Sequence, residues 1–308
     1  MIDTFQISKT FARPPNLSEL ESKSWRPLLD KHTGEPTALC FNSARGEPRL
    51  TLSRTRNDYW IIRAEVSLGS WLHSSNLHLP DENELHRGLD LLSENVEMKS
   101  GVAFDAHTER VTRVDFTHDF QVGENAVIPI IAKFGKIQIP RYKRICFDDT
   151  SVYFKNAGKQ QTKGFLIYSK YHERLANSKD LSEQEKAKGL IRLEVSFRKS
   201  GVARLAKSLK LESHHANHIL TKETSEKAIQ RAMKLLHFDS LLTAADDNAE
   251  KKLFDLHKSN SAFSLVGFLY MKNKYGDDLA KQSFIGSSSK TLKRYSDKCS
   301  KAGVLSLE

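Results

Sequence analysis

The sequence predicts an α+β fold in which an antiparallel sheet is followed by an all-helical C-terminal region. Three observations support this prediction. Runs that alternate between polar and apolar residues recur through residues 1–198, helical patterns interrupt these runs, and no alternating run follows Lys199. We therefore expect an α+β domain over residues 1–198 and a helical region over residues 199–308.

Six segments of the first domain have the period of two that places successive side chains on opposite faces of a strand. The predicted strands cover residues 2–7, 59–68, 111–120, 151–156, 165–172 and 191–198. The run NAGKQQTKG, between the fourth and fifth of them, is typical of a hairpin turn and favours antiparallel pairing.

Helices are predicted between these strands. The first covers residues 81–99, because Asp81 is a good N-cap and Gly101 lies just beyond the helix end. A second covers residues 124–134. The polar stretch 178–189 is predicted as a surface helix that precedes the last strand.

The last third of the sequence has apolar residues at helical spacing. The predicted helices cover residues 200–209, 221–236, 244–257, 262–275, 277–284 and 287–302. A Gly–Ser turn joins the final two, which resemble a helix-turn-helix whose second helix carries Lys290, Lys293 and Arg294. An ordinary pair of antiparallel helices with a solvated basic face would give the same pattern.

The charge of the chain is unevenly distributed. The chain contains 48 Lys and Arg against 38 Asp and Glu, a net charge of +10 at pH 7. The first 150 residues contain 19 basic against 21 acidic side chains, whereas the remaining 158 contain 29 against 17. A basic C-terminal half is typical of proteins that bind DNA or RNA, although a lysine-rich solvated surface would give the same excess.

Several classes of protein are disfavoured by what the sequence lacks. It has no run of 18 apolar residues and no signal-peptide pattern at its start, which argues against membrane insertion and secretion. Cys40, Cys146 and Cys299 lie too far apart for a zinc finger and predict a reducing cytosol. The sequence also lacks a P-loop, a G-x-G-x-x-G motif and an H-E-x-x-H motif.

Three predicted strands repeat one order, in which a basic residue is followed by an acidic one and then by a hydroxyl residue. The triplets are Arg63, Glu65 and Ser67; Arg113, Asp115 and Thr117; and Arg192, Glu194 and Ser196. Alternation places each triplet on one sheet face and its apolar neighbours on the other. If the strands are adjacent, Glu65, Asp115 and Glu194 converge, and oxygen ligands of this kind bind Mg²⁺ or Mn²⁺. Otherwise the face is a solvated surface with cross-strand arginine–carboxylate pairs.

The predicted strand 165–172 adds a candidate nucleophile. Alternation puts Tyr168 and Lys170 on the same face. A tyrosine can attack a phosphodiester when a metal polarises the phosphate and a nearby cation, here Lys170, stabilises the developing charge. Tyr171 is the next candidate if the strand register is shifted, and an ordinary strand aromatic is the alternative for Tyr168.

Several motifs, taken in order, resemble the filamentous-phage gene II/X family of replication initiators. They are Arg113-Val-Asp115-Phe-Thr117, Tyr168-Ser-Lys170-Tyr-His-Glu173 and Gly189-Leu-Ile-Arg192-Leu-Glu194-Val, with the opening Met1-Ile2-Asp3, the segment from Glu65 to Asn76 and the closing helix 289–303. The resemblance covers most of the chain, and the order and number of the motifs carry it.

The resemblance implies a rolling-circle DNA replication initiator that nicks the plus-strand origin of a phage or plasmid. Such proteins stay joined to the 5′ phosphate through a tyrosine, which maps onto Tyr168, and rejoin the displaced strand. Residues 1–198 would then be the nicking and joining domain, related to rolling-circle initiator endonucleases, and residues 199–308 the basic DNA-binding region. Related initiators often hold their metal with a His-x-His pair, which this sequence lacks, so a carboxylate site is expected.

The expected site combines these inferences. Tyr168 and Lys170 are the expected catalytic residues, and Glu65, Asp115 and Glu194 are the expected ligands of Mg²⁺ or Mn²⁺. The expected DNA contacts are Arg113, Arg192, Arg198, Lys290, Lys293 and Arg294. Expected partners are double-stranded and single-stranded origin DNA, host helicase and polymerase, and a second copy in a homodimer, in the cytoplasm of a bacterial host.

Two other functions fit part of the sequence. A non-catalytic origin-binding protein or repressor would explain the charge and the helix-turn-helix pattern but not the acidic strand face beside Tyr168. A relaxase for plasmid transfer would use related chemistry, and the missing histidine pair weighs against it.

Overall fold

The computed structural model describes residues 1–238, apart from 13–14, 17–18, 21–22, 30–32, 35, 42, 45 and 159–160, together with residues 294, 295 and 297. The four helices predicted beyond residue 243, and with them Lys290 and Lys293, lie outside the described residues apart from those last three positions.

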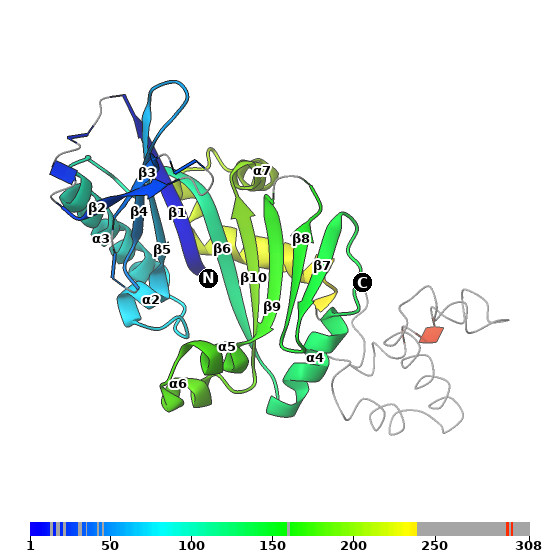
Figure 1. Cartoon of the computed structure of the whole chain (residues 1–308). Helices are drawn as coiled ribbons and strands as arrows, with labels where there is room; N and C mark the ends of the chain where they lie inside the picture. Colours follow the sequence, from blue (N-terminus) through cyan, green and yellow to red (C-terminus); the bar gives the residue numbers. More distant parts are fainter. Residues whose placement is uncertain are drawn as a thin grey trace.

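Ten strands of the described part form one sheet (Figure 1). They are β1 Ile2–Phe11, β2 Trp25–Leu29, β3 Pro36–Phe41, β4 Arg49–Arg54, β5 Trp60–Ser67, β6 Arg110–Gln121, β7 Tyr142–Phe147, β8 Ser151–Asn156, β9 Lys163–Ser169 and β10 Leu190–Arg198. Their order is β2-β3-β4-β5-β1-β6-β10-β9-β8-β7, and every neighbouring pair is antiparallel. The predicted α+β class with an antiparallel sheet is confirmed.

Helices connect the strands, and several of them pack on the apolar face of the sheet. The helices are α2 Leu68–His73, α3 Glu82–Ser100, the short 3₁₀ helix η1 Glu124–Ala126, α4 Val127–Phe134, α5 Lys170–Asn177, α6 Leu181–Lys186, α7 Ser200–Leu209, α8 Ala216–Ile219 and α9 Lys222–Leu235. Both α7 and α9 contact β6 and β10, and α9 crosses behind the central strands in Figure 1. None of the helices in the described part is long and apolar enough to cross a membrane.

The predicted alternation of the strand faces is confirmed. The apolar side chains of the central strands enter one core: Phe5, Ile7, Ile62, Ala64, Val66, Val114, Phe116, Leu193, Val195 and Phe197. Full burial of a large apolar side chain contributes about 1.5–3 kcal/mol. The core therefore fixes the strand registers, and the triplets of basic, acidic and hydroxyl residues lie on the opposite face.

The predicted strand 165–172 is wrong beyond residue 169, where β9 ends and α5 begins. Ser169 is the N-cap of α5, and its side-chain oxygen accepts a hydrogen bond from the His172 backbone N–H. A cap of this kind stabilises a helix by about 1 kcal/mol. Lys170 is therefore the first residue of a helix and not a strand residue.

Strands β2, β3, β4 and β7 were not predicted. The edge strand β7 pairs only with β8 in the described part and leaves most of its side chains exposed or half-exposed. Because neither face of β7 is buried, its sequence does not have the alternation of apolar and polar residues from which a strand is predicted. Residues 200–238 pack on the sheet through α7 and α9, and the predicted domain boundary after residue 198 stays a prediction.

A β-bulge interrupts β1 near its start. The register of β1 against β6 shifts between Ile2 and Thr4, so that Asp3 is an extra residue in the strand. Bulges turn a side chain away from its regular direction. Asp3 is buried, and its charge interacts with Arg192, Lys170 and Asp115, which places it on the polar side of the sheet.

Candidate functional site

A tyrosine and three carboxylates lie together at the centre of the polar sheet face. Asp3 belongs to β1, Asp115 to β6, Glu194 to β10 and Tyr168 to β9. The Tyr168 hydroxyl donates a hydrogen bond to Glu194 Oε1 at 2.7 Å. The charges of Asp3 and Asp115 both act on Glu194, so the three carboxylates form one electrostatic cluster.

Burial changes the protonation of this cluster. It raises the pKa of Asp3 above its usual value. Burial, together with the negative charges of Asp3 and Asp115, raises the pKa of Glu194 to about 7. A carboxylate with a pKa near neutrality can take up and release a proton at physiological pH. Glu194 is thus suited to proton transfer with the hydroxyl that it contacts.

Tyr168 itself is 8% exposed. Burial raises its pKa well above the usual value, and the negative charge of Glu194 raises it further. The phenol is therefore the stable form, and Tyr168 can act as a nucleophile only if its proton passes to an acceptor during the attack. Glu194 is the acceptor within hydrogen-bond distance.

The three carboxylates supply oxygen donors of the kind that a hard cation prefers, although their ligand oxygens do not all lie within 4.8 Å of one another in this structure. Asp3 Oδ1 and Asp115 Oδ1 are buried and have no hydrogen-bond partner within the described residues. Unpaired buried carboxylate oxygens are unfavourable unless a cation or a proton compensates them. Their oxygen chemistry fits Mg²⁺ or Mn²⁺.

Glu65 does not join this cluster, which corrects the expectation that three acidic strands are adjacent. β1 lies between β5 and β6, and Gln6 of β1 donates a hydrogen bond to Glu65 Oε2 at 2.9 Å. The Arg113 guanidinium lies 2.8 Å from Glu65 Oε1 and also contacts Asp115 Oδ2. Both oxygens of Glu65 therefore have protein partners, and Arg113 serves as the cation between Glu65 and Asp115.

Arg192 is an internal structural residue. It is fully buried, pairs with both oxygens of Asp119 at 2.6 and 2.7 Å, and donates to the Asn76 carbonyl at 2.7 Å. This arrangement leaves no support for the expected DNA contact. Arg198 is exposed at the end of β10, and Arg294 is exposed with its guanidinium carbon 6.0 Å from the centre of the Tyr295 ring.

Lys170 lies next to Tyr168 although the strand predicted to carry it ends earlier. Its Nζ is 5.7 Å from the centre of the Tyr168 ring and donates to Asn76 Oδ1 at 2.9 Å. It also forms an ion pair with Glu173 at 2.9 Å and is fully buried. Burial lowers the pKa of Lys170, and Arg192 lowers it further.

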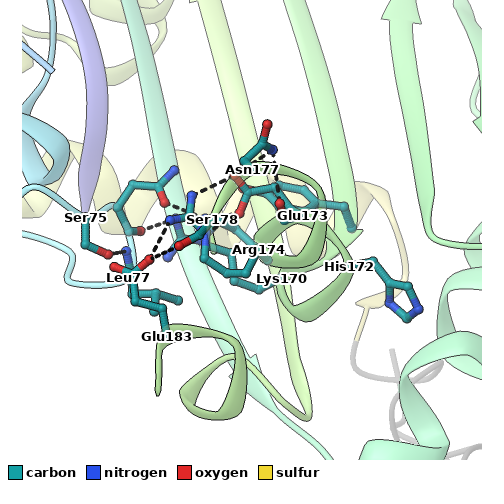
Figure 2. A network of polar contacts seen from close by, with 12 residues as sticks. Ser75, Leu77, Lys170, His172, Glu173, Arg174, Asn177, Ser178 and Glu183 are labelled. Carbon is teal, nitrogen blue, oxygen red and sulfur yellow. Dashed lines mark hydrogen bonds and ion pairs between the residues drawn. The ribbon is translucent and has the colours of Figure 1, made fainter. Parts of the chain in front are cut away.

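An ion-pair network continues from Lys170 along α5 (Figure 2). Glu173 accepts two hydrogen bonds from Arg174, which also pairs with Glu183 of α6 at 3.2 Å. Figure 2 shows Ser75 beside Glu183, so the network joins α5 and α6 to the loop between α2 and α3. The loop, the helix and the strand that carries Tyr168 are thereby held together.

Sequence reasoning missed the roles of Asp3 and Asn76. A bulge has no clear sequence signal, and a strand of regular alternation would not place Asp3 beside Thr4 on the polar face. Asn76 lies in a loop, where its amide and carbonyl reach Lys170 and Arg192. Tyr171, the second tyrosine considered, is half-buried on α5 with its ring 5.4 Å from that of His172.

Fold and site together define an α+β protein that holds a buried tyrosine against carboxylates on an open sheet face. The family of the gene II replication-associated protein, described by its N-terminal region, matches residues 43–231, and the chain belongs to this family. The match covers more than half of the chain, includes Asp115, Tyr168 and Glu194, and confirms the resemblance inferred from the sequence. No match was found among the curated proteins compared.

A rolling circle replication initiator protein from Geobacillus stearothermophilus is among the solved structures similar to this chain. It is 12% identical, with a TM-score of 0.32, over 68% of this chain and 77% of that chain.

Proposed function

We propose that the protein initiates rolling-circle DNA replication by nicking the plus-strand origin of a phage or plasmid through a covalent 5′-phosphotyrosine intermediate. The observation that carries the proposal is the 2.7 Å hydrogen bond from the Tyr168 hydroxyl to Glu194, beside two further carboxylates. Membership of a replication-associated family supports the same function.

The proposed chemistry is a direct displacement at phosphorus. Tyr168 Oη bonds to the scissile phosphate, Glu194 takes the phenolic proton, and the bond from phosphorus to the 3′ oxygen breaks, with that oxygen taking a proton from water. The released 3′ hydroxyl primes synthesis. In the reverse step a 3′ hydroxyl attacks the phosphotyrosine and loses its proton to water, the bond from phosphorus to Tyr168 Oη breaks, and Glu194 returns the proton to that oxygen. Because the phosphotyrosine conserves the energy of the phosphodiester, rejoining needs no ATP.

Asp3, Asp115 and the second oxygen of Glu194 would hold Mg²⁺ or Mn²⁺, with Asp3 in place of the expected Glu65, and their oxygens would have to move closer together around the ion than they lie in this structure. The bound ion would reduce the negative charge of the scissile phosphate. Arg113 keeps Asp115 in place through its guanidinium, and Lys170 keeps Asn76 and α5 in place beside Tyr168. Lys170, proposed from the sequence as a catalytic residue, would then be a positioning residue with its Nζ 5.7 Å from the centre of the Tyr168 ring.

The DNA would cross the polar sheet face toward the basic residues outside it. Arg198 and Arg294 are exposed and keep their proposed roles as DNA contacts, together with Lys290 and Lys293. Helicase and polymerase of a bacterial host, and a second copy of the chain, remain the proposed protein partners.

A test for covalent attachment addresses the proposal directly. Supercoiled DNA with the plus-strand origin of the replicon that encodes this chain is incubated with the protein and Mg²⁺ or Mn²⁺, denatured, and examined for a DNA-linked protein band. We expect the wild type to form the band and Tyr168→Phe to lose it completely, because phenylalanine has no nucleophile.

Tyr171→Phe is the matched control and should keep the band within a few-fold of the wild type. A band that persists in Tyr168→Phe and disappears in Tyr171→Phe would reassign the nucleophile. Tight origin binding without nicking under any metal would instead favour the non-catalytic origin-binding protein or repressor.

A further inference from the structure

Two histidines and a glutamate meet at the junction of α2 and α3, away from the carboxylate cluster. His73 is the last residue of α2, His78 lies in the following loop, and Glu84 is in the first turn of α3. His73 Nε2 lies 2.8 Å from Glu84 Oε1, and His78 Nε2 lies 3.0 Å from Glu84 Oε2. One ligand atom from each side chain lies within 4.8 Å of the other two.

The backbone holds these side chains in place. Glu84 Oε2 accepts a hydrogen bond from the Asp81 N–H at 3.0 Å, and the Asp81 side chain caps α3 in return. The two imidazole rings meet edge to face, with centroids 4.5 Å apart. Gly69 lets α2 approach the loop closely, because a Cβ there would come within 2.6 Å of the His78 carbonyl oxygen.

The donor set selects a class of metal. Imidazole nitrogen with one carboxylate suits Zn²⁺ and neighbouring divalent transition metals, whereas Mg²⁺ prefers oxygen ligands alone. The side chains of His73 and His78 are 34% and 58% exposed, so an ion can enter and keep water as a further ligand. Within the described residues, this is the one group of three His, Cys, Asp or Glu side chains with such spacing.

We propose that His73, His78 and Glu84 bind a divalent transition-metal ion of the Zn²⁺ class, and that this ion fixes the loop between α2 and α3. The loop matters because it carries Asn76, whose side-chain oxygen accepts from Lys170 and whose carbonyl accepts from Arg192. The ligands of this ion lie on both sides of Asn76 in the sequence. A bound ion would therefore hold Asn76 in its contacts with Lys170 and Arg192, beside Tyr168. Binding at this site does not depend on the proposed nicking function.

The test uses the full-length protein, stripped of metal with a chelator and titrated with Co²⁺, which is followed by its visible absorption. We expect the wild type to bind one equivalent at this histidine site, in addition to any Co²⁺ that the carboxylate cluster takes up. His78→Ala should weaken the binding at least about tenfold, because loss of even an outer-shell partner of a metal ligand weakens metal binding by about 10–100-fold. Zn²⁺ should raise the thermal unfolding midpoint of the wild type and leave that of His78→Ala unchanged.

Two variants serve as controls. His86→Ala removes an exposed histidine of the same helix, outside the cluster, and should bind Co²⁺ like the wild type. Glu194→Gln alters the carboxylate cluster and should keep the equivalent of Co²⁺ that His78→Ala weakens, which separates this site from the proposed nicking site. Absent binding in the wild type, unchanged binding in His78→Ala, or an equal loss in His86→Ala would each overturn the proposal.

Discussion

Individual residues on the polar face differ in how their charges are compensated. Glu65 has Arg113 and Gln6 as partners, whereas Asp3 Oδ1 and Asp115 Oδ1 are buried with no partner among the described residues. Buried oxygens without a partner are rare in folded proteins and are often found where an ion or a water binds or where a group has a catalytic role. Asp3 and Asp115 are therefore the carboxylates on which activity should depend.

This difference predicts separate outcomes for similar substitutions. Asp115→Asn keeps the shape of the side chain and removes its charge, so duplex origin binding should stay within about twofold of the wild type. Nicking should fall at least about 100-fold, because the loss of the carboxylate charge weakens binding of the cation. Asp3→Asn should behave in the same way. Binding is measured by a mobility shift, and nicking by the conversion of supercoiled to open circular DNA.

Glu65→Gln is the matched control. It removes one charge from the same sheet face but from a carboxylate whose oxygens are already occupied. Nicking should fall less than about tenfold. Equal losses in Glu65→Gln and Asp115→Asn would restore the three-strand ligand set expected from the sequence. Loss of DNA binding in Asp115→Asn would make Asp115 a structural residue.

Among the elements, strand faces were predictable from the sequence and the end of β9 was not. The side-chain pattern of β5, β6 and β10 alternates locally, and the core confirms it. The run FLIYSKYH alternates equally well, yet Ser169 caps a helix at its middle. The sequence also did not predict which strands are neighbours, because β1, from the start of the chain, lies between β5 and β6. The bulge in β1 has no sequence pattern of its own.

In helix α5, ion pairs lower the pKa of Glu173. Burial alone would raise the pKa of Glu173, but the hydrogen bond from Arg174 and the charge of Lys170 lower it to about 2. The unfolded value is about 4.3, so ionised Glu173 stabilises the fold above that pH. This contribution disappears as the pH falls toward 2.

Glu173→Gln should therefore lower the free energy of unfolding by about 3 kcal/mol at pH 7, and by much less near pH 2. Urea unfolding of both proteins across this range measures the difference. Glu185→Gln, an exposed change on the adjacent α6, should cost less than about 0.5 kcal/mol at every pH. A difference between Glu173→Gln and the wild type that stays constant with pH would contradict the assignment.

For the whole molecule, the basic excess lies in a narrower region than a division at residue 150 indicates. Residues 151–238 contain 18 Lys and Arg against 8 Asp and Glu, whereas residues 239–308 contain 11 against 9. Much of the positive charge therefore belongs to the sheet and to the helices packed on it. Lys163, Arg204 and Arg231 line a cavity of about 230 Å³ between β9, α7 and α9, and none of its lining residues is acidic.

Like charges gathered without an acid favour a bound anion. Burial lowers the pKa of Lys163, and the charge of Arg231 lowers it further. If DNA phosphates supply the counter-charge, the Arg204→Gln/Arg231→Gln double variant should weaken duplex binding. The slope of log K against log salt should become shallower by about 2, since each lost phosphate contact removes about 0.9 from it.

The Lys290→Gln/Lys293→Gln double variant is the informative comparison. It removes the same amount of charge, but from two residues of the predicted helix-turn-helix. Both double variants should make the slope of log K against log salt shallower if duplex DNA contacts the sheet domain and the C-terminal region together. A slope that changes only in the Lys290 and Lys293 pair would restrict the DNA contact to the C-terminal region. The thermal unfolding midpoint of the Arg204→Gln/Arg231→Gln variant must also be measured, since these side chains also hydrogen-bond Thr162 and Ser208. A lower slope at an unchanged midpoint then reports lost phosphate contacts and not a loosened fold.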